Sequence, residues 1–392
     1  MYALEYLPLL LQHYCYTACR HSHEFEEEES CLIRRSSLSV VLLLCTLSSL
    51  LTGCWDTKDI NKRLMPVVMG ICKEKNQNYR IILQIPSPEK QGSQYMESSS
   101  ATITNAIDNI RTKAEKSIDL LHIRLFLICE KTAREDIGDI IDYAVQANDI
   151  SIKGLLAIAR GNFDDVIHHQ INANPELSSY DFFSEQAGWT PETTITRLWE
   201  AYRDIKSYTQ DMSIPILTKG TDTLYKFEGS SIMRVNKMVG EISTNEVLIY
   251  NIFQERYTGG TIEVADQSSV KIKKASIKHT VDWTASGPRL KSRIMLRVEI
   301  LENKNEESEE QITTKLKETI EKRANKLLTE LKNDKADALA IGQLFRKKMT
   351  EEQLKDWKEH WYLVLDNEVT AEITILNSIY LKSPNKIKKP SK

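Results

Sequence analysis

Cys54 is the residue whose surroundings predict a definite chemical reaction. It ends the run Leu51-Thr52-Gly53-Cys54, in which a branched apolar residue, a small residue and a glycine precede the cysteine. This order is typical of a bacterial lipobox, where the thiol receives a diacylglycerol group and a peptidase then frees a new amino terminus, which can also be acylated. Two acyl chains hold a protein stably on a membrane, whereas one chain binds only marginally. We therefore expect Cys54 to be lipidated and to begin the mature chain.

The segment before the lipobox has the composition of a secretory signal peptide. Residues 36–55 carry no charge, and Arg34 and Arg35 stand directly before them. A basic start, an apolar stretch and a small-residue exit are the marks of such a peptide. The alternative is a transmembrane anchor with an incidental cysteine, but the apolar centre, 38–52, is short for a span of ~20 residues. We expect residues 1–53 to be removed.

The first 31 residues do not fit a signal peptide. An acidic block at 26–29 stands where positive charge is expected, and residues 1–20 form a second apolar patch. Residues 1–31 are therefore interpreted as the product of a mis-assigned start, with Leu32 read from a UUG initiation codon.

Composition excludes two broad classes of protein. The 392 residues suit two or three domains, and 41% apolar with 27% charged residues is a globular composition. The net charge of −3 arises in the leader, and beyond Cys54 acidic and basic residues balance. A general nucleic-acid binder would need a basic excess to neutralise phosphates. A polytopic membrane protein would need more than the one long uncharged apolar run.

The chain contains no motif of a known catalytic or cofactor site. It has no Gly-Xaa-Ser-Xaa-Gly elbow, phosphate loop, dinucleotide fingerprint or His-Glu-Xaa-Xaa-His pattern, and no cysteine pair has zinc spacing. His168 and His169 are adjacent, so on a helix they would point in different directions. We expect no enzyme activity, no cofactor and no metal, although many glycosidases also lack a readable motif.

The elements that follow Cys54 predict a mixed α/β domain over residues 54–210. Strand-like runs at 67–72 and 79–85 indicate a hairpin, and apolar strands then alternate with helical patterns up to residue 167. Cys72 and Cys129 lie in apolar strands, which favours buried free thiols over a disulfide. A helix is expected from Thr190-Pro191 to Ile205, with Trp199 on its buried side.

The rest of the chain predicts two further domains and a tail. Short strands separated by glycines over 211–265 indicate a small, β-rich middle domain. Residues 266–383 combine strands with a long helix over 308–332 and a strictly alternating strand at 368–375. Ser308 and Gln311 form a capping box for that helix. The fold class is therefore mixed α+β: an N-terminal mixed sheet with helices, the middle domain, and a C-terminal antiparallel sheet packed by the long helix. The Lys-rich segment 384–392 is expected to be disordered.

Four segments, taken in order, give the chain a resemblance to the C-subunit lipoproteins of spore germinant receptors, the Ger(x)C or GerAC type. They read LTGCWD at 51–56 with DIN at 59–61, HIRLFLI at 122–128, FEGSSI at 227–232 with KMVG at 237–240, and ADALAIG at 336–342 with Trp357 and Trp361. The chain departs from the family pattern where Ala338 and Ala340 replace the usual proline and glycine. Further departures are the Ala-Asn-Asp turn at 147–149 and Ser-Pro at 383–384.

The resemblance implies a three-part lipoprotein on the outer face of the inner spore membrane. It implies that the protein works in nutrient-triggered germination beside two integral-membrane subunits, of A and B type. No catalytic residue is carried over, and only Cys54 transfers as a site. Two alternatives stay open: a solute-binding surface lipoprotein of a transporter, which would need two similar lobes around a cleft, and an anchored hydrolase, which would need converging carboxylates.

Overall fold

The computed structural model describes residues 62–87, 92–169, 193–256, 259–264, 268–304 and 307–376. All of them belong to one unit, 61–392. Cys54, the lipobox residues Leu51, Thr52 and Gly53, the leader and the C-terminal tail lie outside these ranges. In the part of the chain that the structure describes, no helix is both long and apolar enough to cross a membrane.

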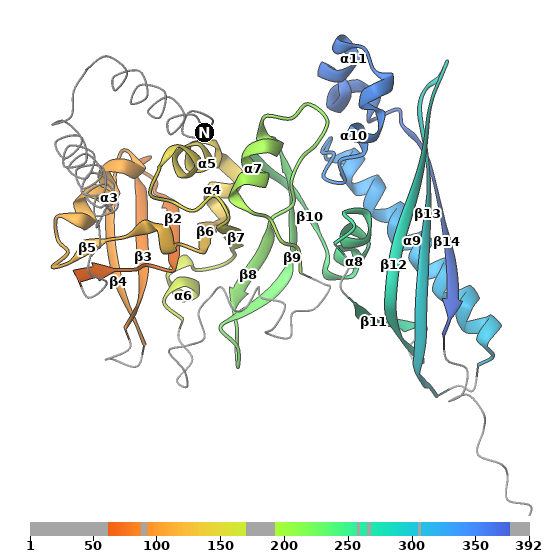
Figure 1. The fold of residues 1–392 in the computed structure, drawn as a ribbon, viewed down its shortest axis with the longest axis horizontal. Helices are drawn as coiled ribbons and strands as arrows, with labels where there is room; N and C mark the ends of the chain where they lie inside the picture. Colours follow the sequence, from red (N-terminus) through yellow and green to blue (C-terminus); the bar gives the residue numbers. More distant parts are fainter. Residues whose placement is uncertain are drawn as a thin grey trace, which may run out of the picture. The chain divides into compact units, whose positions relative to one another are not determined.

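The N-terminal half is built on an eight-stranded mixed sheet (Figure 1). The strand order is β10-β9-β8-β7-β6-β2-β3-β4, and the neighbours among β2, β6, β7 and β8 are parallel. The bounds are β2 Val68–Lys73, β3 Tyr79–Ser87, β4 Gly92–Ser100, β6 Leu125–Cys129, β7 Leu155–Ala159, β8 Pro215–Lys219, β9 Tyr225–Arg234 and β10 Lys237–Ile242. A separate pair, β1 Arg63–Leu64 and β5 Ser117–Ile118, is parallel and is followed by the short helix η3 Leu120–His122. The predicted hairpin is present, with Lys73 opposite Tyr79.

Helices pack against apolar side chains on both faces of this sheet. Successive residues of a strand point to opposite faces, so Met69 belongs to one core and Val68 to another. Helices α3 Ile103–Arg111, α5 Gly138–Gln146 and α7 Leu198–Ile205 pack in the first core, and α6 Phe163–Ile167 packs in the second. The remaining helix, α4 Glu130–Glu135, follows β6 directly.

The strands expected to form a middle domain continue the N-terminal sheet. Ile158 of β7 pairs in parallel with Ile216 of β8, and β9 and β10 extend the sheet by hairpins. A boundary at 210–211 would leave β7 as an unpaired edge, which proteins avoid. The division between 54–210 and 211–265 is therefore corrected for β8, β9 and β10. Helix α8, Thr244–Phe253, packs instead into the C-terminal core.

The C-terminal half is a four-stranded sheet covered by the long helix α9, Glu309–Asn333. Its strands are β11 Gly260–Val264, β12 Ser268–Thr284, β13 Gly287–Asn303 and β14 Asp366–Ile375. Ser308 caps α9 through the backbone N–H of Gln311 at 3.2 Å, and Gln311 accepts from the N–H of Ser308 at 2.8 Å. The mixed α+β class with its two sheets and long helix is confirmed. The last strand, β14, runs parallel to β13, while β11, β12 and β13 are antiparallel.

Between α9 and β14 the chain forms short helical segments. They are α10 Ile341–Phe345, the 3₁₀ turn η6 Arg346–Lys348, α11 Glu351–Lys355 and the π-helical turn η7 Trp357–Trp361.

Cys72 and Cys129 form a disulfide, so the expectation of free thiols was wrong. Their Cα atoms are 5.2 Å apart, within the range that a disulfide requires. The reason is strand order: β2 and β6 are parallel neighbours in which Ile71 pairs with Ile128, and each cysteine is the next residue. The sequence shows two apolar strands but not that they are adjacent.

Candidate functional site

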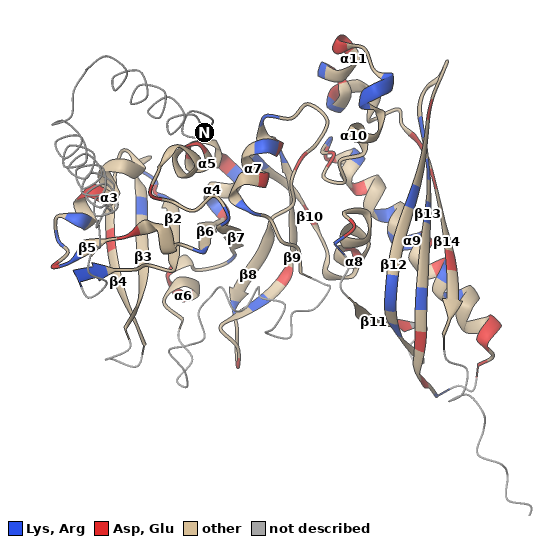
Figure 2. Cartoon of the chain, in the orientation of Figure 1, with Lys and Arg blue, Asp and Glu red and all other residues tan. Residues whose placement is uncertain are grey.

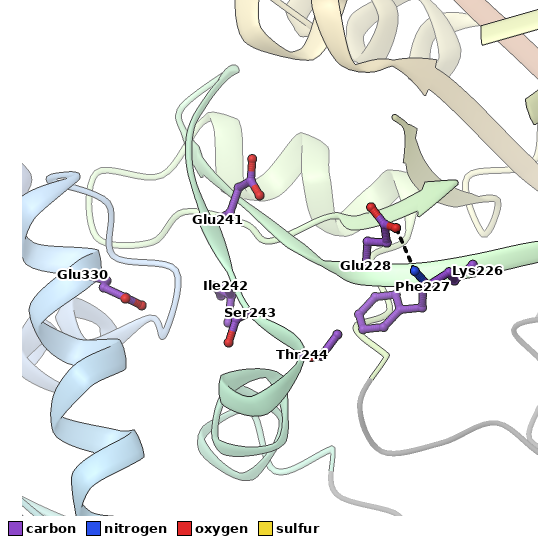
Figure 3. A pocket seen from close by; sticks show the side chains of 8 residues that line it. All are labelled: Lys226, Phe227, Glu228, Glu241, Ile242, Ser243, Thr244 and Glu330. Carbon is purple, nitrogen blue, oxygen red and sulfur yellow. Dashed lines mark hydrogen bonds and ion pairs between the residues drawn. The ribbon is translucent and has the colours of Figure 1, made fainter. Parts of the chain in front are cut away.

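A polar hollow of about 510 Å³ lies among β9, β10, the start of α8 and α9 (Figure 3). Its three carboxylates, Glu228, Glu241 and Glu330, are each paired with a cation. The partners are Lys226 at 3.1 Å, Arg160 at 2.6 Å and Lys326 at 3.6 Å, in that order. Carboxylates held in this way are not arranged as a general acid and base. Within the described ranges, no cluster of three or more His, Cys, Asp and Glu residues could hold a metal ion.

A second hollow, of about 240 Å³, lies where the parallel strands begin. The N–H of Arg124 donates to the carbonyl of Val67 at 2.9 Å, and the N–H of Leu155 donates to the carbonyl of Arg124 at 2.7 Å. The amino ends of β2, β6 and β7 therefore lie side by side, and we call this the amino edge of the sheet. The residues that line the hollow there are Leu121, His122, Ile123, Arg124, Ser151, Lys153 and Gly154.

Helix α7 presents aromatic and cationic side chains to solvent, which corrects the expectation that Trp199 is buried. Trp199 is 40% exposed and Tyr202 is 36% exposed. The Arg203 guanidinium lies 5.3 Å from the Trp199 ring, and the Lys206 ammonium lies 5.5 Å from the Tyr202 ring. Spacings of three and four residues place these side chains on one face of a helix. This geometry is typical of cation–π pairs.

The expected helix over 190–205 also begins later. Residues 193–197 are not helical, and Arg197 forms a β-bridge with Leu155 before α7 starts at Leu198. With this start, Leu198 and Ala201 supply the buried side. The signal that could have exposed the error is the cation four residues after each aromatic residue, at Trp199–Arg203 and Tyr202–Lys206.

We call Trp199, Tyr202, Arg203 and Lys206 the α7 stripe, and its first residue is hydrogen-bonded to the chain at the amino edge. The N–H of Trp199 donates to the carbonyl of Ile152 at 3.1 Å, and the N–H of Leu198 donates to the carbonyl of Gly154 at 2.8 Å. Ile152 is 48% exposed and Leu121 is 55% exposed. We name the combined surface the edge face, made of Leu121, Ile152, Trp199, Tyr202, Arg203 and Lys206.

The two acidic residues of α7 are buried, unlike its cations (Figure 2 shows both signs of charge on this helix). Glu200 and Asp204 are buried. Glu200 binds Arg256, and Asp204 accepts from Arg203 at 2.7 Å. Burial raises the pKa of Asp204 to about 6, against the opposing effect of Arg203. The helix therefore buries its carboxylates and exposes its cations.

A fully buried carboxylate, that of Asp337, organises the segment after α9. It accepts hydrogen bonds from the backbone N–H groups of Ile341 at 2.8 Å and Gly342 at 2.6 Å, and from the indole N–H of Trp357 at 2.8 Å. Burial raises the pKa of Asp337 to about 7, although these three donors favour the ionised form. Gly342 is required by close approach, because a Cβ there would lie 2.5 Å from the indole nitrogen.

Lys358 connects this segment to the chain that precedes β8. Its ammonium donates to the carbonyls of Ser207 at 3.0 Å and Gln210 at 2.9 Å, and to the Asp211 carboxylate at 2.7 Å. The other oxygen of Asp211 accepts from the N–H of Asp337 at 2.9 Å, and the N–H of Asp211 donates to the carbonyl of Asp337 at 2.9 Å. We call Asp211, Asp337, Trp357 and Lys358 the joint.

One residue beside the joint, three positions after Asp337, has a left-handed backbone conformation. Ala340 has φ of 57° and precedes α10. This region favours glycine, since a Cβ there approaches the following carbonyl. The resemblance described above implies glycine at this position, and the conformation of Ala340 supplies a physical reason for it.

Cys54 and the lipobox residues Leu51, Thr52 and Gly53 lie outside the described residues, so lipidation stays a prediction. The edge face and the joint carried no predicted role. The sequence singles out Trp357 and the segment 336–342 only as markers of resemblance, and Trp199 only as a buried helix residue.

Two family models match the chain, one for each half. Residues 56–219 match the spore germination protein N-terminal domain, and residues 228–379 match the C-terminal model described as spore germination B3/GerAC like. Together they cover most of the chain.

Three curated proteins of Bacillus subtilis (strain 168) are similar to it. YfkR, whose name also refers to spore germination, is 30% identical over 144 residues, which are 33% of this chain and 36% of that protein. Spore germination protein B3 is 23% identical over 58% of this chain and 65% of its own length. Spore germination protein A3 is 24% identical over 57% of this chain and 62% of its own length. The chain thus spans less than two thirds of each of these relatives.

A solved structure has the same fold. The crystal structure of the GerBC protein aligns with a TM-score of 0.54 at 16% identity, over 79% of this chain and 97% of that one. The matched models, the sequence relatives and this fold agree, and the chain belongs to the GerAC family of spore germination proteins.

Proposed function

We propose that the chain is the lipid-anchored C subunit of a nutrient germinant receptor. In this proposal Cys54 carries the lipid, the protein lies on the outer face of the inner spore membrane, and it acts through contacts with integral-membrane A-type and B-type subunits. It has no catalytic step of its own. The observation that carries the proposal is the position of the family match, which starts at residue 56, two residues after the lipobox cysteine.

The two alternative functions receive less support. A solute-binding lipoprotein would need two similar lobes, but the two sheets differ, with eight strands in one and four in the other. An anchored hydrolase would need free, converging carboxylates, but the carboxylates of the 510 Å³ hollow are paired with cations.

Fractionation of sporulating cells that express the full chain tests the anchor. We expect the wild-type protein in the membrane fraction, with a diacylated peptide that begins at Cys54. Cys54→Ala should abolish the modification and the nutrient response. Cys45→Ala is the matched control, because it removes a cysteine of the signal segment and should change neither. An unmodified Cys54 in a chain that retains Met1 would defeat the proposal.

Association with partners needs a separate measurement. Affinity purification of the detergent-solubilised, lipidated chain should recover an A-type and a B-type subunit. Recovery of the ATPase subunits of a permease would instead support the solute-binding alternative.

A further inference from the structure

We infer that the edge face is a membrane-docking surface, which rests against anionic lipid headgroups when the protein is anchored. The inference rests on the lipid anchor of the proposed function and adds an orientation to it. The occupant is a bilayer surface that contains anionic lipid.

The composition of the edge face is that of a membrane interface. Trp and Tyr are enriched at the headgroup level, where their rings are half in apolar surroundings and their polar atoms stay in water. Trp199 and Tyr202 are partly exposed on α7, and Leu121 and Ile152 are exposed at the amino edge, where the carbonyl of Ile152 accepts from the N–H of Trp199. Arg203 and Lys206 lie over the rings, where they can also reach lipid phosphates.

Charge at the amino edge favours an anionic surface. Besides Arg203 and Lys206, Lys153 is exposed beside Ile152 and lines the smaller hollow. Three carboxylates lie among these cations: Asp204 beside Arg203 at 2.7 Å, Asp142 beside Lys206 at 3.4 Å, and Asp149 beside Arg111 at 2.5 Å. Basic residues near an anionic leaflet contribute attraction that falls off within a Debye length. The group thus has four cations, Arg111, Lys153, Arg203 and Lys206, against three carboxylates, and its excess of one positive charge complements such a leaflet.

The path of the chain keeps this edge near the anchor. Arg63 begins β1, and its guanidinium binds Asp119 at 2.7 Å. The carboxylate of Asp119 in turn accepts from the N–H of Leu121 at 3.1 Å. Cys54 precedes Arg63 by nine residues, which can span at most ~30 Å when fully extended. A lipid on Cys54 thus holds the Leu121 end of the edge face within reach of the bilayer.

A dye at the edge face of the lipidated protein tests the inference. After lipidation of Cys54 and pairing of Cys72 with Cys129, Ile152→Cys supplies the one reactive thiol of the mature chain. An environment-sensitive dye on it should shift to the blue on vesicles of phosphatidylcholine with phosphatidylglycerol. It should not shift on phosphatidylcholine alone. Leu301→Cys is the matched control, since Leu301 is similarly exposed but lies on β13.

Variants that remove one positive charge, made in the same dye-labelled chain, measure the electrostatic contribution to docking on anionic vesicles. Arg203→Gln and Lys206→Gln should each lower the ratio of docked to undocked protein about fivefold, which follows from ~1 kcal/mol per basic residue near an anionic surface. Added salt should act in the same direction. Lys355→Gln, in exposed α11, should leave the ratio unchanged.

The outcomes separate docking from anchoring. Vesicle-bound protein without a dye shift overturns the docking and leaves the anchor in place. Protein that does not stay on vesicles overturns the anchor and the docking with it. A shift that occurs only when the A-type and B-type subunits are present, whatever the lipid charge, assigns the edge face to a protein partner and overturns the inference.

Discussion

The joint and the edge face use the same kinds of side chain in opposite ways. In the joint, Lys358 is 9% exposed and donates to three oxygen atoms, one of them on the fully buried Asp211. In the edge face, Lys206 is exposed, lies over a tyrosine ring and has one carboxylate 3.4 Å away. A buried charge is costly unless every partner is in place, so the joint selects one geometry. An exposed charge can exchange partners at little cost.

The two regions also share a segment of chain. Residues 206–211 start at the last residue of the α7 stripe and end at the carboxylate that Lys358 binds. The joint therefore fixes the position of the chain that directly follows the edge face. Variants of the two regions should accordingly separate stability from surface binding.

Removal of the buried cation should have the largest effect. Lys358→Met leaves the Asp211 carboxylate buried without its ammonium partner, and loss of one member of a buried pair costs ~3–5 kcal/mol. Urea denaturation should show that decrease in the free energy of unfolding. Lys355→Met, three residues earlier in an exposed pair with Glu351, is the control and should change it by less than ~0.5 kcal/mol. Equal effects of the two variants would remove the distinction between buried and exposed cations.

The second largest effect on the free energy of unfolding is expected for Asp337→Asn, and it should depend on pH. Asp337→Asn places an amide donor against groups that themselves donate, so we expect a loss of ~1–3 kcal/mol. Burial raises the pKa of Asp337 in the folded state to about 7, above the ordinary value for an aspartate, 3.8. The folded state therefore binds more protons, and the contribution of this group to stability falls as pH rises from ~4 to ~7.

Urea denaturation at pH 5 and pH 8 measures this contribution. Between pH 5 and pH 8, the free energy of unfolding of the variant should fall less than that of the wild type. The part of the decrease that comes from Asp204 should remain in both proteins. An unchanged pH dependence in Asp337→Asn would show that the carboxyl group is ionised throughout.

A smaller change should strengthen the joint. Ala340→Gly relieves a left-handed conformation that costs ~1–2 kcal/mol for a residue with a Cβ, and the greater freedom of glycine in the unfolded chain offsets ~0.4–1 kcal/mol. We expect a net gain of ~0.5–1 kcal/mol, seen as a rise in Tm. Ala338→Gly, two residues earlier at a buried position, should be destabilising. A loss of stability in both variants would contradict the conformational explanation.

The smallest effect on stability is expected at the edge face. Trp199→Ser with Tyr202→Ser removes two rings that are 40% and 36% exposed and lie outside the buried core, so the free energy of unfolding should change by less than ~1 kcal/mol for the pair. Dye-reported docking on anionic vesicles should nevertheless be lost. Unfolding of this variant would show that the two rings belong to the core after all.

Local patterns predicted the helices and strands that depend on local signals. Ser308 and Gln311 identified the start of α9, and the alternation at 368–375 identified β14, because capping and periodicity are read within one element. The association of β8 with β7 was not readable, since it pairs segments nearly 60 residues apart.

The same limit applies to both regions compared above. Asp337 lay in a recognised segment, but its partner Asp211 is 126 residues away in the sequence. Trp199 was misplaced because Leu198 and Ala201, at neighbouring helical positions, already supply the buried side of α7. Periodicity reports which residues share a face but not which of two adjacent faces meets the sheet.

The oxidation state of Cys72 and Cys129, which form the disulfide, reports the environment that each molecule has met. The two residues are separated by 57 positions and joined across neighbouring strands, so a chain that folds under reducing conditions holds both thiols in place but unpaired. Unpaired thiols can be alkylated after denaturation, and paired ones cannot. When thiols are trapped in the intact cell, the fraction of Cys72 that resists alkylation therefore measures whether the folded protein has met an oxidising environment, and it distinguishes material exported from a reducing cytosol from material that never left it.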